Sequence, residues 1–182
     1  MFMRGEHWEE CVLIDDSVRA NPMARELLKV GKAQETFVWK DPDTGMLCKC
    51  KTDWYNPQHK ALVDLKTAEN GTPLGFGRAV ANFGYHIQDA FYRDGVISLG
   101  RDVHEFIFMV VEKPLKDMKP DPRLVSFYRL SPSDIEEGRR TYQSALAGIS
   151  MCQMTDVWPG YTEDVVEIMR PGWARQSDVE EQ

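Results

Sequence analysis

Two acidic positions at the ends of successive strand-like runs constrain this chain more than any other feature. The first run covers residues 46–54 and contains Asp53, and the second covers residues 61–66 and contains Asp64 and Lys66. If the two strands pair as neighbours, both carboxylates and the ammonium of Lys66 converge, because residues two apart share a strand face. Carboxylate oxygens are ligands that Mg²⁺ prefers. The pattern therefore predicts a phosphodiester-cleaving site in which a metal activates water and a cation supports developing negative charge.

Length and charge bound the remaining possibilities. The chain has 182 residues, of which 42% are apolar, so it can form one domain with a real core, or one domain with a tail. Its net charge of −7 argues mildly against nucleic-acid binding, which usually needs a basic footprint. A local basic strip can coexist with an acidic whole. Candidates that lie near the proposed site in sequence are Lys49, Lys51, Lys60, Lys66 and Arg78.

The sequence shows neither a signal peptide nor an apolar span long enough to cross a membrane, and residues 1–12 are too polar for either. We therefore expect a cytoplasmic protein without a membrane partner. The cysteines are Cys11, Cys48, Cys50 and Cys152, and none forms a C-x-x-C pair. Cys48 and Cys50 share a strand face, and we interpret them as buried, inert thiols. The alternative is an iron–sulfur cluster, which usually needs tighter grouping than this.

Turn signals and apolar periodicity predict the order of the elements. A helix begins at Pro22 and ends near Gly31, a strand covers residues 34–39, and residues 41–45 form a hairpin turn. In a tight hairpin Glu35 would lie opposite Lys51 and would share a sheet face with Asp53. Glu35 is thus either a further acidic metal ligand or a surface glutamate paired with Lys51.

A single long helix is predicted over residues 74–92, because apolar residues recur there at helical spacing. Gln88 and Tyr92 lie one turn apart on that helix. Residues 105–111 and 124–130 read as strands, residues 131–151 as a helix that Ser131 caps, and residues 165–169 as a last short strand. This order predicts an α/β fold in which helices flank a mixed central sheet.

The motifs carry a resemblance to a known family. Asp53 with Asp64-Leu65-Lys66 resembles the PD-(D/E)xK nuclease signature, with Thr52 in place of the usual proline. The segment Tyr85-His86-Ile87-Gln88-Asp89-Ala90-Phe91-Tyr92 resembles the Gln-x-x-x-Tyr motif of the RecB-like branch. Together with residues 41–53, Trp158-Pro159 and Trp173-Ala174, these motifs resemble the nuclease domains of RecE-type exodeoxyribonuclease VIII. The resemblance implies a restriction-endonuclease-like core over residues 35–174, which an N-terminal helical segment (1–34) precedes and an acidic tail (175–182) follows.

The resemblance also implies an activity. Such enzymes are Mg²⁺-dependent exonucleases on the ends of double-stranded DNA. They degrade one strand 5′ to 3′ in recombination or phage-like replication, and Mn²⁺ is expected to substitute for Mg²⁺. A single-strand annealing protein then uses the 3′ tail, and relatives assemble as homo-oligomeric rings. By resemblance Asp53, Asp64 and the carbonyl of Leu65 bind metal, Lys66 orients or deprotonates water, Gln88 braces the site, and Tyr92 packs or contacts phosphate.

The sequence departs from the family pattern at its start. Relatives carry an upstream histidine or glutamate that joins the metal site, and no Gly-x-x-x-His segment is found here. Either the chain is shortened or Glu35 substitutes. Two other functions therefore stay open: an endonuclease on the same fold, and a non-catalytic DNA-binding subunit. Most tryptophans are interpreted as core or interface residues, and Trp54 beside Asp53 is the exception that could stack on a base.

Overall fold

The computed structural model describes residues 5–113 and 123–172. Trp173-Ala174 and the predicted acidic tail lie outside the described residues. The helices are α1 (Gly5–Ala20), α2 (Pro22–Leu27), α3 (Pro73–Phe83), α4 (Tyr85–Ser98) and α5 (Pro132–Thr155). The strands are β1 (Lys32–Ala33), β2 (Thr36–Lys40), β3 (Leu47–Lys51), β4 (Trp54–Asn56), β5 (Ala61–Ala68), β6 (Glu105–Glu112) and β7 (Val125–Tyr128).

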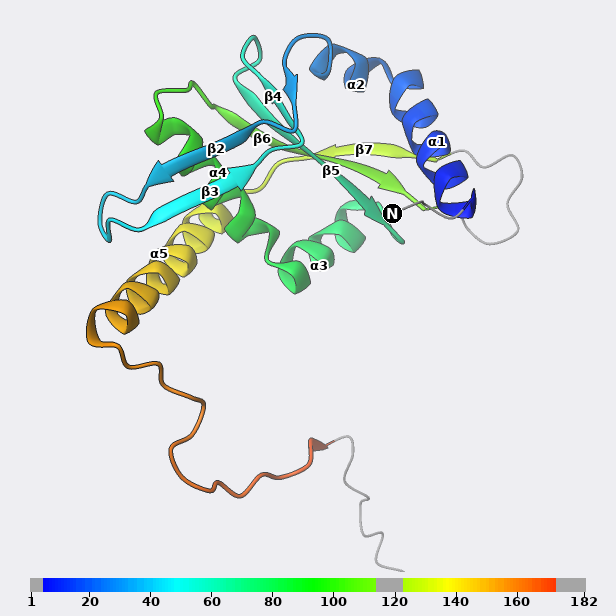
Figure 1. Cartoon of the computed structure of the whole chain (residues 1–182). Coiled ribbons are helices and arrows are strands. Elements are labelled where there is room, and N and C mark those ends of the chain that lie inside the picture. Colours follow the sequence, from blue (N-terminus) through cyan, green and yellow to red (C-terminus); the bar gives the residue numbers. More distant parts are fainter. Residues whose placement is uncertain (1–4, 114–122, 173–182) are drawn as a thin grey trace, which may run out of the picture.

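A five-stranded sheet organises the molecule (Figure 1). Its strand order is β1-β4-β5-β6-β7, in which β5 and β6 run parallel and the other neighbours run antiparallel. The parallel pair is joined through α3 and α4, because parallel neighbours need a long crossover. The predicted mixed sheet flanked by helices is confirmed.

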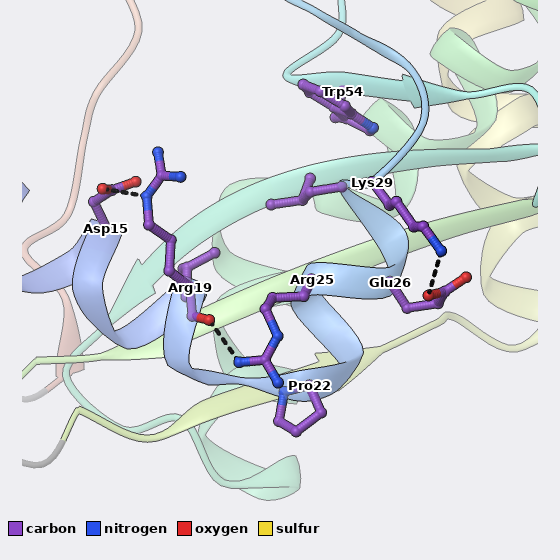
Figure 2. A pocket seen from close by; sticks show the side chains of 9 residues that line it. Asp15, Arg19, Pro22, Arg25, Glu26, Lys29 and Trp54 are labelled. Atoms are coloured by element: carbon purple, nitrogen blue, oxygen red, sulfur yellow. Dashed lines mark hydrogen bonds and ion pairs between the residues drawn. The ribbon is translucent and has the colours of Figure 1, made fainter.

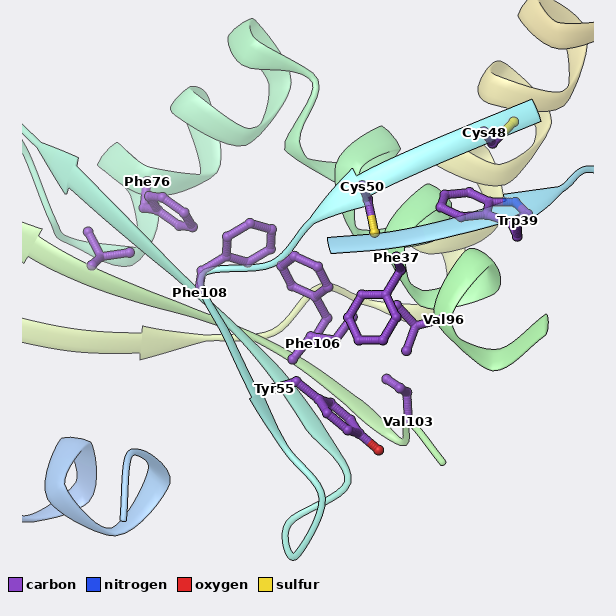
Figure 3. Packing of buried hydrophobic residues seen from close by; sticks show 12 residues of the cluster. Phe37, Trp39, Cys48, Cys50, Tyr55, Phe76, Val96, Val103, Phe106 and Phe108 are labelled. Atoms are coloured by element: carbon purple, nitrogen blue, oxygen red, sulfur yellow. The ribbon is translucent and has the colours of Figure 1, made fainter. Parts of the chain in front are cut away.

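Alternating side chains of the central strands supply a separate core on each face of the sheet. On one face Leu62, Phe106 and Phe108 pack with Phe76 of α3 and Val96 of α4, as Figure 3 shows in part. On the other face Val63, Met109 and Val111 pack against α1 and α2 through Val18, Ala24 and Leu27. The helices therefore divide into two layers, with α3, α4 and α5 on the first face and α1 and α2 on the second.

The predicted strand over residues 46–54 is two strands. β3 pairs only with β2, in a separate two-stranded ribbon, whereas β4 pairs with β5 in the main sheet. The chain passes from one to the other at Thr52 and Asp53. The prediction that the two motif-bearing strands pair as neighbours is therefore correct for β4 and β5, in which Trp54 lies opposite Val63. Asp53 lies immediately before the first paired residue of β4.

The hairpin register differs by one residue from the prediction. Thr36, and not Glu35, lies opposite Lys51. The turn holds four residues between Asp41 and Met46, where the backbone N–H of Asp41 donates to the carbonyl of Met46 at 2.8 Å. A shift of one residue exchanges the two faces of a strand. Glu35 consequently lies on the inner side of the ribbon and away from Lys51.

The single long helix predicted over residues 74–92 is also wrong, since Gly84 separates α3 from α4. Gly84 adopts φ +67°, a left-handed conformation that costs little only for glycine. It ends α3 and begins α4, so the apolar stripe is broken there. Phe83, which a continuous helix would have buried, is 70% exposed.

Other boundaries follow local capping chemistry. Asn21 accepts hydrogen bonds from the N–H groups of Met23 and Ala24, and Ser131 accepts one from Asp134, so both predicted helix starts are confirmed. The predicted strand over residues 165–169 is wrong, because residues 157–171 form neither helix nor strand. Within residues 5–113 and 123–172, no helix combines the length and apolar character needed to cross a membrane.

Candidate active site

Asp64, Lys66 and Gln88 form a closed group on the α4 side of the sheet. Asp64 and Lys66 lie two residues apart on β5, and the Lys66 ammonium contacts Oδ2 of Asp64 in an ion pair. The side-chain amide of Gln88 donates to Oδ1 of Asp64 at 2.6 Å, and its oxygen accepts from Nζ of Lys66 at 3.0 Å. The predicted proximity of these side chains is therefore present, and α4 supplies the residue that bridges them.

Burial makes Asp64 electrostatically unusual. Its residue is only 6% exposed, and burial raises the pKa of its carboxyl. Contact with Lys66, through hydrogen bonding and charge, lowers this pKa, and so does the hydrogen bond from Gln88. The negative charge of Asp53 raises it. Oδ2 has its ion pair with Lys66 but no hydrogen bond of good geometry. A buried carboxylate oxygen with a free lone pair is well suited to meet an additional cation.

Asp53 joins the same region from the edge of the sheet. Its Oδ2 accepts a hydrogen bond of 2.9 Å from the backbone N–H of Leu65. The N–H and C=O of one strand residue point to the same strand edge, so the carbonyl of Leu65 faces the edge where Asp53 lies. Both acidic arms and this carbonyl are therefore positioned by adjoining strands.

Gln34 is a neighbour of Asp53 that sequence reasoning missed. Its side-chain amide donates to Oδ1 of Asp53 at 3.1 Å, and its backbone N–H donates to the carbonyl of Asp53 at 3.0 Å. Gln34 has φ +55°, which is uncommon for a residue with a side chain. Nothing in the sequence signals this contact, because it joins residues on either side of the β2–β3 ribbon.

Two tyrosines of α4 complete the surroundings. The ring of Tyr85 lies under the Lys66 ammonium, 4.6 Å from centroid to Nζ, in a cation–π contact. Tyr92 packs its ring against Phe91 and Phe106. Burial raises the pKa of Tyr92, and the negative charges of Asp64 and Asp53 add to that rise, which places its hydroxyl within their field. Tyr85 was not predicted to contribute.

Glu35 does not join this group in the structure. Its carboxylate forms ion pairs with Lys32 at 3.3 Å and Arg101 at 3.6 Å. The register on which its predicted role rested is wrong, and in the described part of the chain no contact links it to Asp53 or Asp64. Its inward position beside Tyr55 explains this, since it faces the pocket that Arg101 lines.

A groove on the α1–α2 face reaches the same sheet edge. A cavity of about 460 Å³ is lined by Gln34, Asp53, Trp54 and Leu65, among others. It shares Val18, Leu28 and Trp54 with a neighbouring pocket of about 730 Å³. Figure 2 shows that second pocket, where Arg19 pairs with Asp15 and Lys29 with Glu26 below the ring of Trp54. Trp54 therefore forms part of a groove wall as well as packing on the second core.

The cysteines occupy separate places. Cys48 and Cys50 are buried on the inner face of the ribbon, as their spacing predicts (Figure 3). Cys11 lies on α1 and Cys152 on α5, in layers on opposite faces of the sheet (Figure 1). The four thiols therefore do not converge on one cluster site.

Comparison with known proteins identifies the family. A family model described as "PDDEXK-like domain of unknown function (DUF3799)" matches residues 10–170, which is most of the chain. The chain belongs to this PDDEXK-like family. The match includes the arms with Asp53 and Asp64 and the helix with Gln88, so membership of the PD-(D/E)xK superfamily is confirmed.

The fold is similar to that of solved structures. The chain matches a protein from Eubacterium rectale, provisionally described as an exonuclease, with a TM-score of 0.65 and 18% identity over 90% of this chain. The chain spans 63% of the length of that protein. A phage-related exonuclease from Haemophilus somnus 129PT matches with a TM-score of 0.49 and 12% identity, over 86% of this chain and 76% of its own. No curated protein matches.

The residues at the PDDEXK-like site fit a divalent cation, which nucleases of this superfamily generally use. The donor set is two carboxylates and a backbone carbonyl, all hard oxygen ligands. Among the described residues, no three His, Cys, Asp or Glu side chains gather to hold a metal. A cation held by few protein ligands, with water and substrate phosphate filling the rest, is typical of Mg²⁺. The partly unsatisfied Oδ2 of Asp64 is consistent with that chemistry.

Proposed function

We propose that this chain is a divalent-metal-dependent nuclease that hydrolyses phosphodiester bonds in DNA. The observation that carries the proposal is the closed contact of Asp64, Lys66 and Gln88 next to Asp53. Burying a carboxylate costs free energy of desolvation, and buried carboxylates in polar clusters of this kind are typical of functional sites. Membership of the PDDEXK-like family supports the reaction class.

In the proposed mechanism Asp53, Asp64 and the carbonyl of Leu65 would hold the cation. When bound, the cation polarises the phosphate and activates water. Leu65 fixes Asp53 by donating its N–H, so both carboxylates keep their relative position without rearrangement. We propose Mg²⁺ as the ion, with Mn²⁺ as a substitute.

Lys66 supplies positive charge beside the scissile phosphate. Its ammonium contacts the carboxylate of Asp64, the side-chain oxygen of Gln88 and the ring of Tyr85, and these three contacts fix its position. Such a cation orients the attacking water and stabilises negative charge that develops on the phosphate. Gln88 braces both partners from α4, and Tyr92, one turn further along that helix, packs on Phe91 and Phe106.

A finer proposal follows from the motifs. We propose an exonuclease of the RecE type that acts on the ends of linear duplex DNA, removes one strand 5′ to 3′, and leaves a 3′ tail for an annealing partner. The joint presence of the Asp-x-Lys arm and Gln88 with Tyr92 supports this, as does the provisional description of the fold relative. A homo-oligomeric ring and a cytoplasmic location belong to the same proposal.

Matched variants test the reaction. Asp64→Asn and Lys66→Met should reduce Mg²⁺-dependent nucleotide release from a linear duplex with a 5′ phosphate by about 10²-fold or more. Asp89→Asn is the control, because Asp89 is also a buried carboxylate paired with a cation but lies outside the site. Circular dichroism of each variant checks folding. Equal nucleotide release by wild type, Asp64→Asn and Lys66→Met would refute the assignment.

The substrate form separates the other two functions. An exonuclease needs an end and leaves a covalently closed circle intact, whereas an endonuclease cuts it. A non-catalytic subunit binds the linear duplex and releases no nucleotide at any Mg²⁺ or Mn²⁺ concentration. Cleavage of the closed circle at the rate of the linear duplex would overturn the exonuclease proposal while leaving the metal site in place.

A further inference from the structure

The β2–β3 ribbon has two chemically distinct faces. Its inner face buries Phe37, Trp39, Cys48 and Cys50 against α4, as Figure 3 shows. Its outer face is exposed along both strands and contains no acidic residue. We call it the lysine face, and it consists of Thr36, Val38, Lys40, Leu47, Lys49 and Lys51.

The lysines of this face differ from the other lysines of the protein. The side chains of Lys40, Lys49 and Lys51 form neither a hydrogen bond nor an ion pair within the described ranges. Every other lysine that the structure describes lies in an ion pair with a carboxylate; these are Lys29, Lys32, Lys60, Lys66 and Lys113. In a chain of net charge −7, the uncompensated lysines therefore gather on one surface.

Pairing register sets their spacing. Lys49 and Lys51 are two residues apart on β3, which corresponds to roughly 6.5–7 Å along a strand. Lys40 lies opposite Leu47, so it is the diagonal neighbour of Lys49 at about 7–8 Å. Three like charges so close repel one another, and a polyanion lying along the ribbon removes that repulsion.

The lysine face leads to the candidate active site. Lys51 is the last residue of β3, and Asp53 follows it after one buried residue, Thr52. One end of the lysine face therefore lies two residues in sequence from Asp53, whose carboxylate meets Leu65 at the sheet edge. The exposed side chains between the lysines are Thr36, Val38 and Leu47, so this face offers no aromatic platform for unpaired bases. That favours contact with phosphates of a duplex over stacking on a single strand.

We propose that the lysine face binds the phosphate backbone of the DNA duplex that enters the candidate active site. The proposal rests on the proposed function for the identity of the substrate. Lys40, Lys49 and Lys51 each neutralise a phosphate, which positions the duplex without reading its sequence. Binding through this face is electrostatic and needs no divalent metal.

Salt dependence of DNA binding tests the proposal directly. Fluorescence anisotropy of a labelled blunt duplex is measured in EDTA over a range of KCl, so that no cleavage occurs. A Lys40→Gln/Lys49→Gln/Lys51→Gln variant should flatten the slope of log Kobs against log[KCl] by about 2.7, at roughly 0.9 for each phosphate contact. Its affinity at low salt should fall at least about tenfold.

Two matched variants control for charge and folding. Lys29→Gln/Lys60→Gln/Lys113→Gln removes the same charge from ion-paired lysines and should keep the wild-type slope. Lys40→Arg/Lys49→Arg/Lys51→Arg keeps the charge of the lysine face and should also keep it. An unchanged slope in the Lys40→Gln/Lys49→Gln/Lys51→Gln variant would overturn the proposal. So would an equal change of slope in the Lys29/Lys60/Lys113 control.

The same experiment separates this proposal from the nuclease proposal. If Asp64→Asn abolishes cleavage but the lysine-face variant binds as wild type, the nuclease assignment stands and the lysine face is wrong. If the slope falls as expected while wild type never releases nucleotides, DNA binding by this face stands and catalysis is wrong. If the three-lysine variant loses slope with single-stranded DNA but not with the duplex, the choice of duplex as the ligand is contradicted.

Discussion

The carboxylate of Asp53 accepts a hydrogen bond of 2.9 Å from the backbone N–H of Leu65. This bond ties the point where the chain leaves the ribbon to the strand that holds Asp64 and Lys66. Because the donor is a backbone N–H, substitution of the Leu65 side chain does not remove this hydrogen bond. The relative position of the two acidic arms is therefore set by strand geometry.

Gln34 should control metal affinity through Asp53. Removing its amide in Gln34→Ala or Gln34→Gly leaves Oδ1 of Asp53 without its donor, so the carboxylate is less fixed. Loss of such an outer partner typically weakens metal binding about 10–100-fold. Electron paramagnetic resonance of added Mn²⁺ measures this independently of catalysis. The control is Gln58→Ala at an exposed turn residue. Wild-type Mn²⁺ affinity in both Gln34 variants would contradict the prediction.

Cys50 should be nearly inert to thiol reagents in the folded protein. Burial raises its pKa to about 11, so far less thiolate is present at pH 8 than for an ordinary thiol near 9. Exposed Cys11 should react fast with iodoacetamide, and Cys50 should react only as the pH approaches 11 or the protein unfolds. Peptide mass spectrometry of a time course gives each rate. Equal rates for Cys11 and Cys50 at pH 8 would show that the ribbon does not pack as described.

The crossing of α4 and α5 should depend on Gly138. A Cβ at this position would lie 2.1 Å from the backbone oxygen of His86, so Gly138→Ala must push the helices apart. We expect a loss of about 1–3 kcal/mol in the free energy of unfolding. Gly148→Ala on the same helix meets no atom within 4 Å and should instead stabilise by about 0.5–1 kcal/mol. Urea unfolding measures both, and equal signs for the two variants would refute the close approach.

Tyr142 should make stability fall in alkaline solution. Its hydroxyl donates to Asp94 at 2.8 Å, and burial followed by that carboxylate raises its pKa above the ordinary value near 10. The unfolded chain loses this proton near pH 10 while the folded chain keeps it, so the stabilisation is complete below pH 10 and shrinks above it. The stability difference between wild type and Tyr142→Phe should therefore narrow above pH 10. Tyr161→Phe, at an exposed site, should leave the wild-type pH dependence unchanged.

Local rules were enough to bring part of the candidate site together. Strand alternation places Asp64 and Lys66 on one face whatever the rest of the fold does, and helical spacing places Gln88 and Tyr92 one turn apart. Capping chemistry likewise located the starts of α2 and α5 at Asn21 and Ser131. Each of these patterns depends on residues close in sequence, so it can be read without knowing the tertiary contacts.

The remaining features were decided by contacts that no local pattern specifies. The observed pairing register, shifted by one residue from the expected one, puts Glu35 on the inner side of the ribbon and Lys40, Lys49 and Lys51 on the outer side. The sequence by itself determined which residue types could build a metal site and a sheet to hold it. Only the tertiary structure brought Gln34 to Asp53, because their contact depends on how the ribbon folds back on the sheet. Register and chain reversal depend on packing between distant segments, so the sequence pattern leaves them open.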